Sequence, residues 1–443
     1  MDEENNIEAT PISKNVPEQH KNWAAPFFTI WTGQALSLIG SQVGQFALVW
    51  WLTQASGGSA TILTMATFVS MLPSIFLGPF IGALVDRLNR RRVMILADSL
   101  IALFSAGLAV ISWIGALQIW HVYLVMFLRS VGGTFHYAAM QSSTSLMVPR
   151  TQLARVGGMN QTLRGALDII TPPIGAMLLE WLPLYWIMSI DVATAAFAVV
   201  PLFFVHIPQP KRRTEVSIAD TRTESLPLMS LIRDVAGGFT YVWNWPGLFI
   251  ILLMASMLNM MAIPAFSLLP FLIKNYFAMG ALQLGWFNSA WGFGVVAGGL
   301  VLSVWGGFRR KVFTSILGLM GMGVGTFIVG IVPATGFWTA LAGMAFAGFM
   351  NPIVNAPFFA ILQSAVAPEI QGRVFTTIST MSGGASLLGM AIAGPLADSA
   401  GVQVWFIAAG VISILMGIAL YFIPATMHIE EDAREREKEH SWA

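Results

Sequence analysis

Long apolar stretches, each separated from the next by a short polar or charged break, recur along the whole chain. A stretch of about 20 apolar residues lets a helix cross the hydrocarbon core of a bilayer. The pattern therefore predicts twelve membrane-spanning helices in two sets of six. The first set covers residues near 27–52, 60–84, 94–114, 119–147, 158–181 and 184–206. The second set covers residues near 248–273, 283–306, 312–333, 337–366, 375–398 and 402–424.

Helices fit these stretches better than strands do. Open strands would leave backbone N–H and C=O groups unpaired in lipid, and the stretches lack the alternating polar positions of a barrel strand. The composition agrees, because 56% of the 443 residues are hydrophobic and only 10% are charged, against about 25% in soluble domains. The predicted fold class is an all-α integral membrane protein with twelve transmembrane helices.

Basic residues are confined to one side of the predicted membrane. Of the 23 Lys and Arg, Arg129 and Arg164 lie inside spans, Lys274 lies on the side opposite the termini, and the others share the side of the termini. The positive-inside rule then places both termini in the cytosol of a multi-pass protein of the plasma membrane. Tryptophans near the opposite ends of the spans are predicted anchors at the interface: Trp50, Trp51, Trp113, Trp120, Trp181, Trp186, Trp338 and Trp405.

The longest internal loop divides the two sets of spans, and the two halves resemble each other. QSSTSLMVPRTQLARV after the fourth span is similar to LQSAVAPEIQGRV after the tenth, and GGFRRK after the eighth is a weakened copy of GALVDRLNRRR after the second. This internal similarity predicts two six-helix repeats around a central cavity. The predicted organisation is a cytosolic tail, a helix bundle, a cytosolic loop, a second bundle and a cytosolic tail, over residues 1–26, 27–206, 207–247, 248–424 and 425–443.

The stretch GALVDRLNRRR, residues 82–92, contains more charge than orientation alone requires. Its arginines are sufficient as a positive-inside anchor, which is the simpler interpretation. Asp86, however, lies at the cytosolic end of the second span, where a carboxylate can cap the amino end of a neighbouring helix. The eleventh span begins on the same side, near Phe375. We therefore expect Asp86 to hold the halves together in one conformation and to release them in another.

This stretch resembles the loop motif of the major facilitator superfamily, with Asn89 where the family usually has Gly. Asn tolerates the left-handed backbone that such a turn requires. Further stretches resemble the macrolide-efflux branch: IWTGQALSLIGSQ, FLGPFIGALVDR, FLRSVGGTFH, SIDVATA and PEIQGRVF. In the fifth span TPPIGA, residues 171–176, departs from the glycine-rich motif of drug–proton antiporters. The resemblance implies a conformational gate formed by Gly82, Asp86, Arg87, Asn89, Arg90 and Arg91.

Three charged residues inside the spans are candidates for a charge pair or for proton coupling: Arg129, Asp168 and Asp191. Charge in lipid is costly, so such residues face the protein interior, pair with each other or carry protons. Arg129 with Asp191 forms either a structural ion pair or a coupling site. Asp168 lies one helical turn from Arg164, and the two either neutralise each other or leave Asp168 available.

The resemblance implies that the first, fourth, seventh and tenth spans line the substrate cavity. Polar residues occur on these spans among Met, Phe and Trp, a mixture that suits a bulky and mostly apolar ligand. Each polar residue either contacts the ligand or serves helix packing. The candidates are Gln34, Ser41, Gln45, His136, Asn259, Asn351 and Asn355.

The sequence favours a transporter over an enzyme. It has no phosphate-binding GxxxxGK[ST] motif, so ATP-driven transport would need another subunit. With zero cysteines and no HExxH motif, it predicts no metal site and no cofactor. Its predicted partners are a small-molecule substrate, protons and the lipid bilayer, without nucleic acid, and the predicted unit is a monomer. Three functions stay open: a proton-coupled exporter of amphipathic drugs, a transporter of a metabolite, siderophore or lipid, and a transport-inactive sensor.

Overall fold

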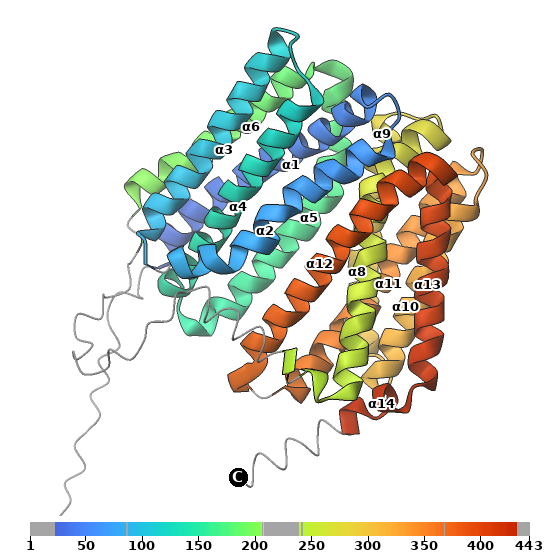
Figure 1. The fold of residues 1–443 in the computed structure, drawn as a ribbon. Helices are drawn as coiled ribbons and strands as arrows, with labels where there is room; N and C mark the ends of the chain where they lie inside the picture. Colours follow the sequence, from blue (N-terminus) through green and yellow to red (C-terminus); the bar gives the residue numbers. More distant parts are fainter. Residues whose placement is uncertain are drawn as a thin grey trace, which may run out of the picture.

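The computed structural model describes residues 23–85, 87–205, 207, 239–240, 242–366 and 368–431, which are mostly helical and contain no strand (Figure 1). The first half contains α1 (Ala24–Ala55), α2 (Ala60–Val85), α3 (Arg90–Trp113), α4 (Ile119–Met147), α5 (Leu153–Trp181) and α6 (Leu184–Phe204). The second half contains α8 (Pro246–Phe271), α9 (Ala281–Trp305), α10 (Lys311–Ile331), α11 (Phe337–Ala365), α12 (Pro368–Ala400) and α13 (Val402–Phe422). The short elements are η2 (Arg150–Gln152), η4 (Leu272–Tyr276) and α14 (Pro424–Met427).

These long helices confirm the twelve predicted spans. Nine of the described helices are long and apolar enough to cross a membrane, and α4, α5 and α12 are less apolar than this criterion requires. The start of α12 was predicted too late, at Phe375 rather than at Pro368. Its first turns contain the polar sequence PEIQGR, which hydropathy assigns to a loop although the backbone there is already helical.

The two halves repeat one packing pattern. In the first half α1 packs against α5 and α6, α3 against α4 and α6, and α2 against α4. In the second half α8 packs against α12 and α13, α10 against α11 and α13, and α9 against α11. Each of these contacts in one half has its counterpart in the other, which confirms two six-helix repeats. The predicted cytosolic tails and central loop consist largely of residues 1–22, 208–238 and 432–443, which lie outside the described residues. Their cytosolic location stays a prediction.

The halves meet along two helix pairs, α5 with α9 and α2 with α12. On α9, a Cβ added to Gly285 would lie 3.1 Å from the Pro172 carbonyl oxygen of α5, and one added to Gly292 would lie 2.6 Å from Ile169. Both Pro172 and Pro173 lie inside α5, which continues through them. The fifth span has prolines where close packing would favour glycines, and Gly285 and Gly292 of the facing helix α9 provide the close approach instead.

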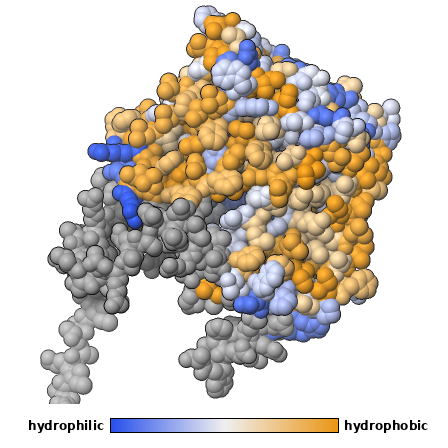
Figure 2. All heavy atoms as spheres, viewed as in Figure 1, coloured by the Kyte–Doolittle hydropathy of each residue, from blue (hydrophilic) through white to orange (hydrophobic). Residues whose placement is uncertain are grey.

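The outer surface of the helices is apolar, as a lipid-facing surface requires (Figure 2). Large side chains such as Leu103, Leu300 and Val304 are exposed on it. Five of the predicted tryptophan anchors are also exposed: Trp113, Trp120, Trp181, Trp186 and Trp338. The anchor prediction is wrong for Trp50 and Trp405, because both are buried, and the Trp405 indole donates to the Met261 carbonyl oxygen at 3.0 Å.

Candidate transport cavity and its closure

The helix bundle has two ends. We call the end with the connections at residues 87–89 and 306–310 the basic end, because it contains Arg87, Arg309 and Arg310. The far end contains the connections at residues 56–59 and 277–280. These names describe position in the bundle and imply no side of the membrane.

A cavity of about 330 Å³ lies between the two halves, and we call it the interfacial cavity. Helices α1 and α5 line it from one half, and α8 and α9 line it from the other. Its walls are mostly apolar and aromatic, with three amides and one carboxylate: Gln42, Gln45, Phe46, Val49, Asp168, Thr171, Pro172, Phe266, Leu269, Pro270, Leu284, Asn288 and Trp291. Such a mixture suits an amphipathic ligand.

Asp168 is the carboxylate in this wall, and its side chain is exposed. Among the described residues, no hydrogen bond or ion pair within 4.0 Å reaches its oxygens. Arg164 does not form an ion pair with it at that distance; its guanidinium lies 5.5 Å from the centre of the Tyr137 ring on α4. Asp168 therefore presents an unpaired carboxylate to the interfacial cavity.

The far end is closed by Asp398, near the carboxyl end of α12, which caps the amino end of α2. Its carboxylate accepts from the backbone N–H groups of Ala60 and Thr61, at 2.5 and 3.0 Å. It also accepts from the hydroxyls of Ser59 and Thr61, at 3.0 and 2.6 Å. The unpaired N–H groups of a helix amino end favour an anion, so this contact joins the two halves.

Other contacts strengthen the same closure. The Lys274 ammonium donates to the Thr53 carbonyl oxygen at the end of α1, at 2.9 Å. The Ser267 and Thr67 hydroxyls lie 2.8 Å apart between α8 and α2. The Ser289 hydroxyl on α9 donates to the Ile169 carbonyl oxygen on α5, at 2.6 Å, at the level of the interfacial cavity. The halves are therefore joined by hydrogen bonds both at the far end and beside the interfacial cavity.

Toward the basic end, α5 presents a polar and exposed face. Gln161, Thr162 and Arg164 are all exposed there, although they belong to a membrane-spanning helix. A Cβ added to Gly165 on α5, or to Gly299 on α9, would meet no atom within 4 Å. Exposed polar groups at membrane depth occur where they line water-filled space, so this face of α5 indicates such space toward the basic end.

Arg129 and Asp191 form an ion pair inside the first half, between α4 and α6. Asp191 is only 2% exposed, and its two oxygens accept from the hydroxyls of Ser41 on α1 and Ser105 on α3, each at 2.8 Å. We call these four residues the Asp191 cluster. Both carboxylate oxygens are already bonded, so the cluster joins four helices and Asp191 is turned toward its own partners rather than toward the interfacial cavity. A substrate contact by Ser41 stays a prediction.

Gln34 and His136 also lie inside the first half. The Gln34 amide on α1 donates to Asp98 on α3 at 3.0 Å, and the His136 ring on α4 lies 3.6 Å from the same carboxylate. Gln34 and Asp98 are buried. The polar groups of both predicted cavity residues are thus turned toward Asp98 rather than toward the interfacial cavity, and their contact with a substrate stays a prediction.

The predicted gate motif lies at the basic end. Asn89 is the N-cap of α3, and its side chain accepts from the Arg92 N–H at 3.1 Å. The expected left-handed backbone is wrong at Asn89, which is extended with φ −73°, because capping rather than a tight turn determines this position. Asp86 lies outside the described residues, so its cap on α12 stays a prediction.

The other gate residues attach the α2–α3 connection to the first half. The Arg90 guanidinium donates to the Ser142 carbonyl oxygen on α4 at 3.1 Å. Arg91 donates to the Leu202 and Phe203 carbonyl oxygens at the carboxyl end of α6. Arg87 is exposed, and a Cβ added to Gly82 would meet no atom within 4 Å. Arg90 and Arg91 therefore pair with helix carbonyls, which adds a structural role to that of a positive-inside anchor.

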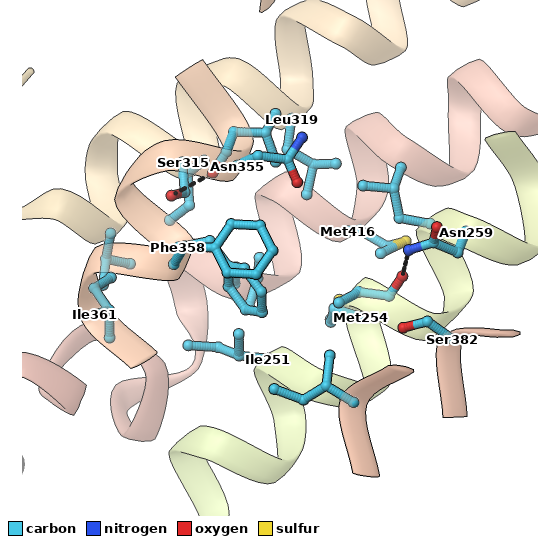
Figure 3. Close-up of a pocket in the computed structure, with 18 of the residues that line it drawn as sticks. Ile251, Met254, Asn259, Ser315, Leu319, Asn355, Phe358, Ile361, Ser382 and Met416 are labelled. Carbon is cyan, nitrogen blue, oxygen red and sulfur yellow. Dashed lines mark hydrogen bonds between the residues drawn. The ribbon is translucent and has the colours of Figure 1, made fainter. Parts of the chain in front are cut away.

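Two predicted cavity residues of the second half, Asn259 and Asn355, line a separate cavity within that half (Figure 3). Asn351 accepts through its backbone carbonyl from the Asn355 amide at 3.0 Å, and it is not part of that lining. Of the predicted cavity residues, Gln45 is the one that shares the interfacial cavity with Asp168. The predicted set is thus distributed over several places in the fold.

Sequence reasoning missed Asp398 and most of the residues that line the interfacial cavity, Trp291 among them. Asp398 lies near the end of the eleventh span, as Asp86 lies at the end of the second, and this matching position was a signal that could have identified it. Trp291 is an aromatic in an apolar span, where nothing distinguishes a cavity wall from a packed core.

Comparison with known proteins agrees with this architecture. The chain is 32% identical over 401 residues to macrolide efflux protein A of Streptococcus pyogenes, over 90% of this chain and 96% of that protein. It is 24% identical over 420 residues to the multidrug efflux pump Tap of Mycobacterium tuberculosis, over 91% and 95% of the two chains. A bacterial homologue of the iron transporter ferroportin, solved in the inward-facing state, has the same fold, with a TM-score of 0.68 at 15% identity over 89% and 98% of the chains. A family model described as a transmembrane secretion effector matches residues 23–442. The chain therefore belongs to this transporter family, within the major facilitator superfamily.

Proposed function

We propose that the protein exports amphipathic small molecules, macrolide-like drugs among them, from the cytosol by alternating access coupled to proton antiport. The interfacial cavity supports this proposal most directly, because its apolar walls contain one unpaired carboxylate, Asp168. Relatives named for macrolide and multidrug efflux match nearly the whole chain, which favours drugs over a metabolite, siderophore or lipid. One chain builds the complete cavity, which is consistent with a monomer.

The basic end faces the cytosol in this proposal, and both termini lie there. The exposed arginines of the α2–α3 and α9–α10 connections favour this orientation by the positive-inside rule. With the far end closed by Asp398 and polar α5 exposed toward the basic end, the conformation is then the one that receives a substrate from the cytosol. Its likeness to an inward-facing solved structure supports the assignment.

Asp168 is the carboxylate that we propose to carry the proton. A proton carrier must bind and release its proton in turn, and an exposed carboxylate without an ion pair can do so at little cost to the structure. Protonation of Asp191 would instead break the buried Arg129 ion pair and leave a charge uncompensated. A proton on Asp168 removes the negative charge from the cavity wall, which weakens the hold on a cationic substrate and couples its release to proton entry.

Alternating access then requires the far end to open. Opening separates Asp398 from the amino end of α2 and breaks its bonds to Ser59, Ala60 and Thr61. We propose that Asp86, on the opposite end of the same antiparallel helix pair, caps α12 once the basic end closes. One contact would replace the other during transport, so neither conformation is favoured by a large margin.

Purified protein in phospholipid vesicles tests the proposal directly. An imposed pH gradient should drive the movement of a macrolide and of the lipophilic cation tetraphenylphosphonium, with no nucleotide present. Asp168→Asn should still bind the macrolide but should lose gradient-driven movement, and Asp168→Glu should restore part of it. Movement that requires ATP and ignores the gradient would contradict antiport. Absence of movement for both compounds in the unaltered protein would favour the metabolite transporter or the sensor instead.

A further inference from the structure

The second half contains its own cavity of about 310 Å³, which we call the C-half cavity (Figure 3). It lies among α8, α10, α11, α12 and α13, toward the basic end, and shares no lining residue with the interfacial cavity. Its volume is at the lower end of the range of about 300–1,000 Å³ that is typical of small-molecule sites. It is therefore a second place in the molecule where a small ligand fits.

Among the described residues that line the C-half cavity, none has a charged side chain. Aliphatic, Met and Phe side chains make up most of it, and the rings of Phe358 and Phe359 lie 5.5 Å apart at 66°. Burial of an ionised ligand there would lack a compensating partner, which costs far more than burial of a neutral one. The lining therefore favours an uncharged apolar ligand.

Two asparagines give this cavity a specific polarity. The Asn259 amide donates to the Ala255 carbonyl oxygen at 2.9 Å, and the Asn355 amide donates to the Asn351 carbonyl oxygen at 3.0 Å. Each amide nitrogen uses one of its two N–H groups within its own helix. No described residue donates to either side-chain oxygen, so each oxygen is left as an acceptor. The two residues face the cavity from α8 and α11 (Figure 3).

An acceptor inside an apolar cavity costs free energy until a donor reaches it. A ligand with an O–H or N–H group satisfies the acceptor, whereas a ligand of the same shape without a donor leaves it unsatisfied. The asparagines therefore predict that the cavity binds the ligand with a donor more tightly than the ligand without one. A purely apolar cavity would not distinguish the two in this way.

The C-half cavity is also linked to the interfacial cavity. A smaller cavity of about 30 Å³ shares Leu258 with the C-half cavity and shares Phe266 and Trp291 with the interfacial cavity. The Phe266 and Trp291 rings lie 4.6 Å apart at 80° and form the wall between the two spaces. The two sites are thus neighbours that aromatic side chains separate.

We propose that the C-half cavity is a second binding site, which takes an uncharged apolar compound with one or two hydrogen-bond donors. The interfacial cavity, which contains Asp168, takes the cationic compounds. The proposal for the C-half cavity does not depend on transport or on proton coupling, because it concerns binding to the protein at rest.

Binding to the purified protein in detergent tests this with a matched pair of probes, 1-naphthol and 1-methoxynaphthalene, which differ by one O–H donor. We expect 1-naphthol to bind more tightly by roughly fivefold, the effect of one neutral hydrogen bond. Asn355→Leu should reduce this preference, and the double variant Asn259→Leu/Asn355→Leu should remove it while retaining binding of the methoxy compound. Ser382→Phe, which fills the cavity from α12, should weaken the binding of both probes.

Tetraphenylphosphonium provides the control for the other site. Its binding should persist in Ser382→Phe and weaken in Asp168→Asn, while 1-naphthol should show the opposite pattern; this also demonstrates that both variants are folded. Equal affinities for the two naphthalenes, or 1-naphthol binding that neither Asn355→Leu nor Ser382→Phe changes, would overturn the proposal. Displacement of 1-naphthol by added phospholipid would also overturn it, by showing that an acyl chain is the occupant. Failure of tetraphenylphosphonium to bind would count against the proposed function alone.

Discussion

The two halves of the molecule share one packing pattern, but the contacts between helices inside each half differ in chemistry. The interior of the first half contains the buried Asp98 and the Arg129–Asp191 ion pair, each bonded across helices. The second half has no Asp, Glu, Lys or Arg between residues 312 and 368. Its helices approach one another through glycines, as α1 and α6 of the first half also do at Gly33 and Gly40. On α9, for example, a Cβ added to Gly298 would collide with the Phe349 backbone of α11.

The difference shows that one topology can be stabilised in two ways. In the first half, directional bonds to buried charges add to close glycine contacts between α1 and α6, since such charges must keep their partners in apolar surroundings. Close backbone approach holds the second half, where small residues let helices pack tightly without polar groups. A neutral interior leaves the second half suited to uncharged ligands, and the charge that we propose to couple protons lies in the first.

The largest expected effect comes from breaking the Asp191 cluster. Asp191→Ala leaves Arg129 as an unpaired buried charge, which should destabilise the protein by about 3–5 kcal/mol. The midpoint of thermal unfolding in detergent, followed by tryptophan fluorescence, measures the loss. Asp168→Ala is the control, because that carboxylate is exposed and unpaired, and its midpoint should change little. Equal losses in the two variants would mean that the first half does not depend on its ion pair.

Two adjacent glycines test the packing of the second half. Gly298→Leu forces a side chain into the Phe349 backbone, whereas Gly299→Leu meets no atom within 4 Å of its Cβ. We expect the first change to cost about 1–3 kcal/mol and the second to be nearly neutral. The same unfolding measurement compares them. Similar midpoints for the two variants would contradict close backbone approach as the basis of stability in this half.

Asp398→Asn tests the contact that joins the halves, with a smaller expected effect. It keeps the shape of the side chain but removes the charge from the amino end of α2, a contribution of about 0.3–2 kcal/mol. The population open at the far end should rise, by up to about thirtyfold. Because the chain has no cysteine, Gln45→Cys can report access to the interfacial cavity.

In that background, a membrane-impermeant thiol reagent applied from the far side should label the cavity faster when Asp398→Asn is also present. Ser399→Ala is the matched control, since among the described residues the Ser399 hydroxyl bonds to carbonyl oxygens of its own helix, and the contact between the halves should be unaffected. Unchanged labelling in Asp398→Asn would show that Lys274 and the Ser267–Thr67 contact suffice to close the far end.

Sequence reasoning was most successful where a property repeats over many residues. The length and hydropathy of the apolar stretches located the spans, and the similarity of GGFRRK to GALVDRLNRRR indicated the repeat. It was less successful for single side chains, because a polar residue on a span has several possible partners. Gln34 and Gln45 lie three helical turns apart on α1, yet one is bonded to Asp98 and the other lines the interfacial cavity.

The sequence by itself determined the helices, the two-fold repeat and the presence of charge inside the spans. These follow from the properties of the lipid, since a chain in a bilayer must pair its backbone N–H and C=O groups internally and can contain few charged side chains. Only the tertiary structure decided that Asp191 is paired while Asp168 is not, and that Asp398 caps a helix more than 300 residues away in the chain. Such pairings depend on which helix faces are brought together, and hydropathy carries no information about the direction in which a neighbouring helix points its side chains.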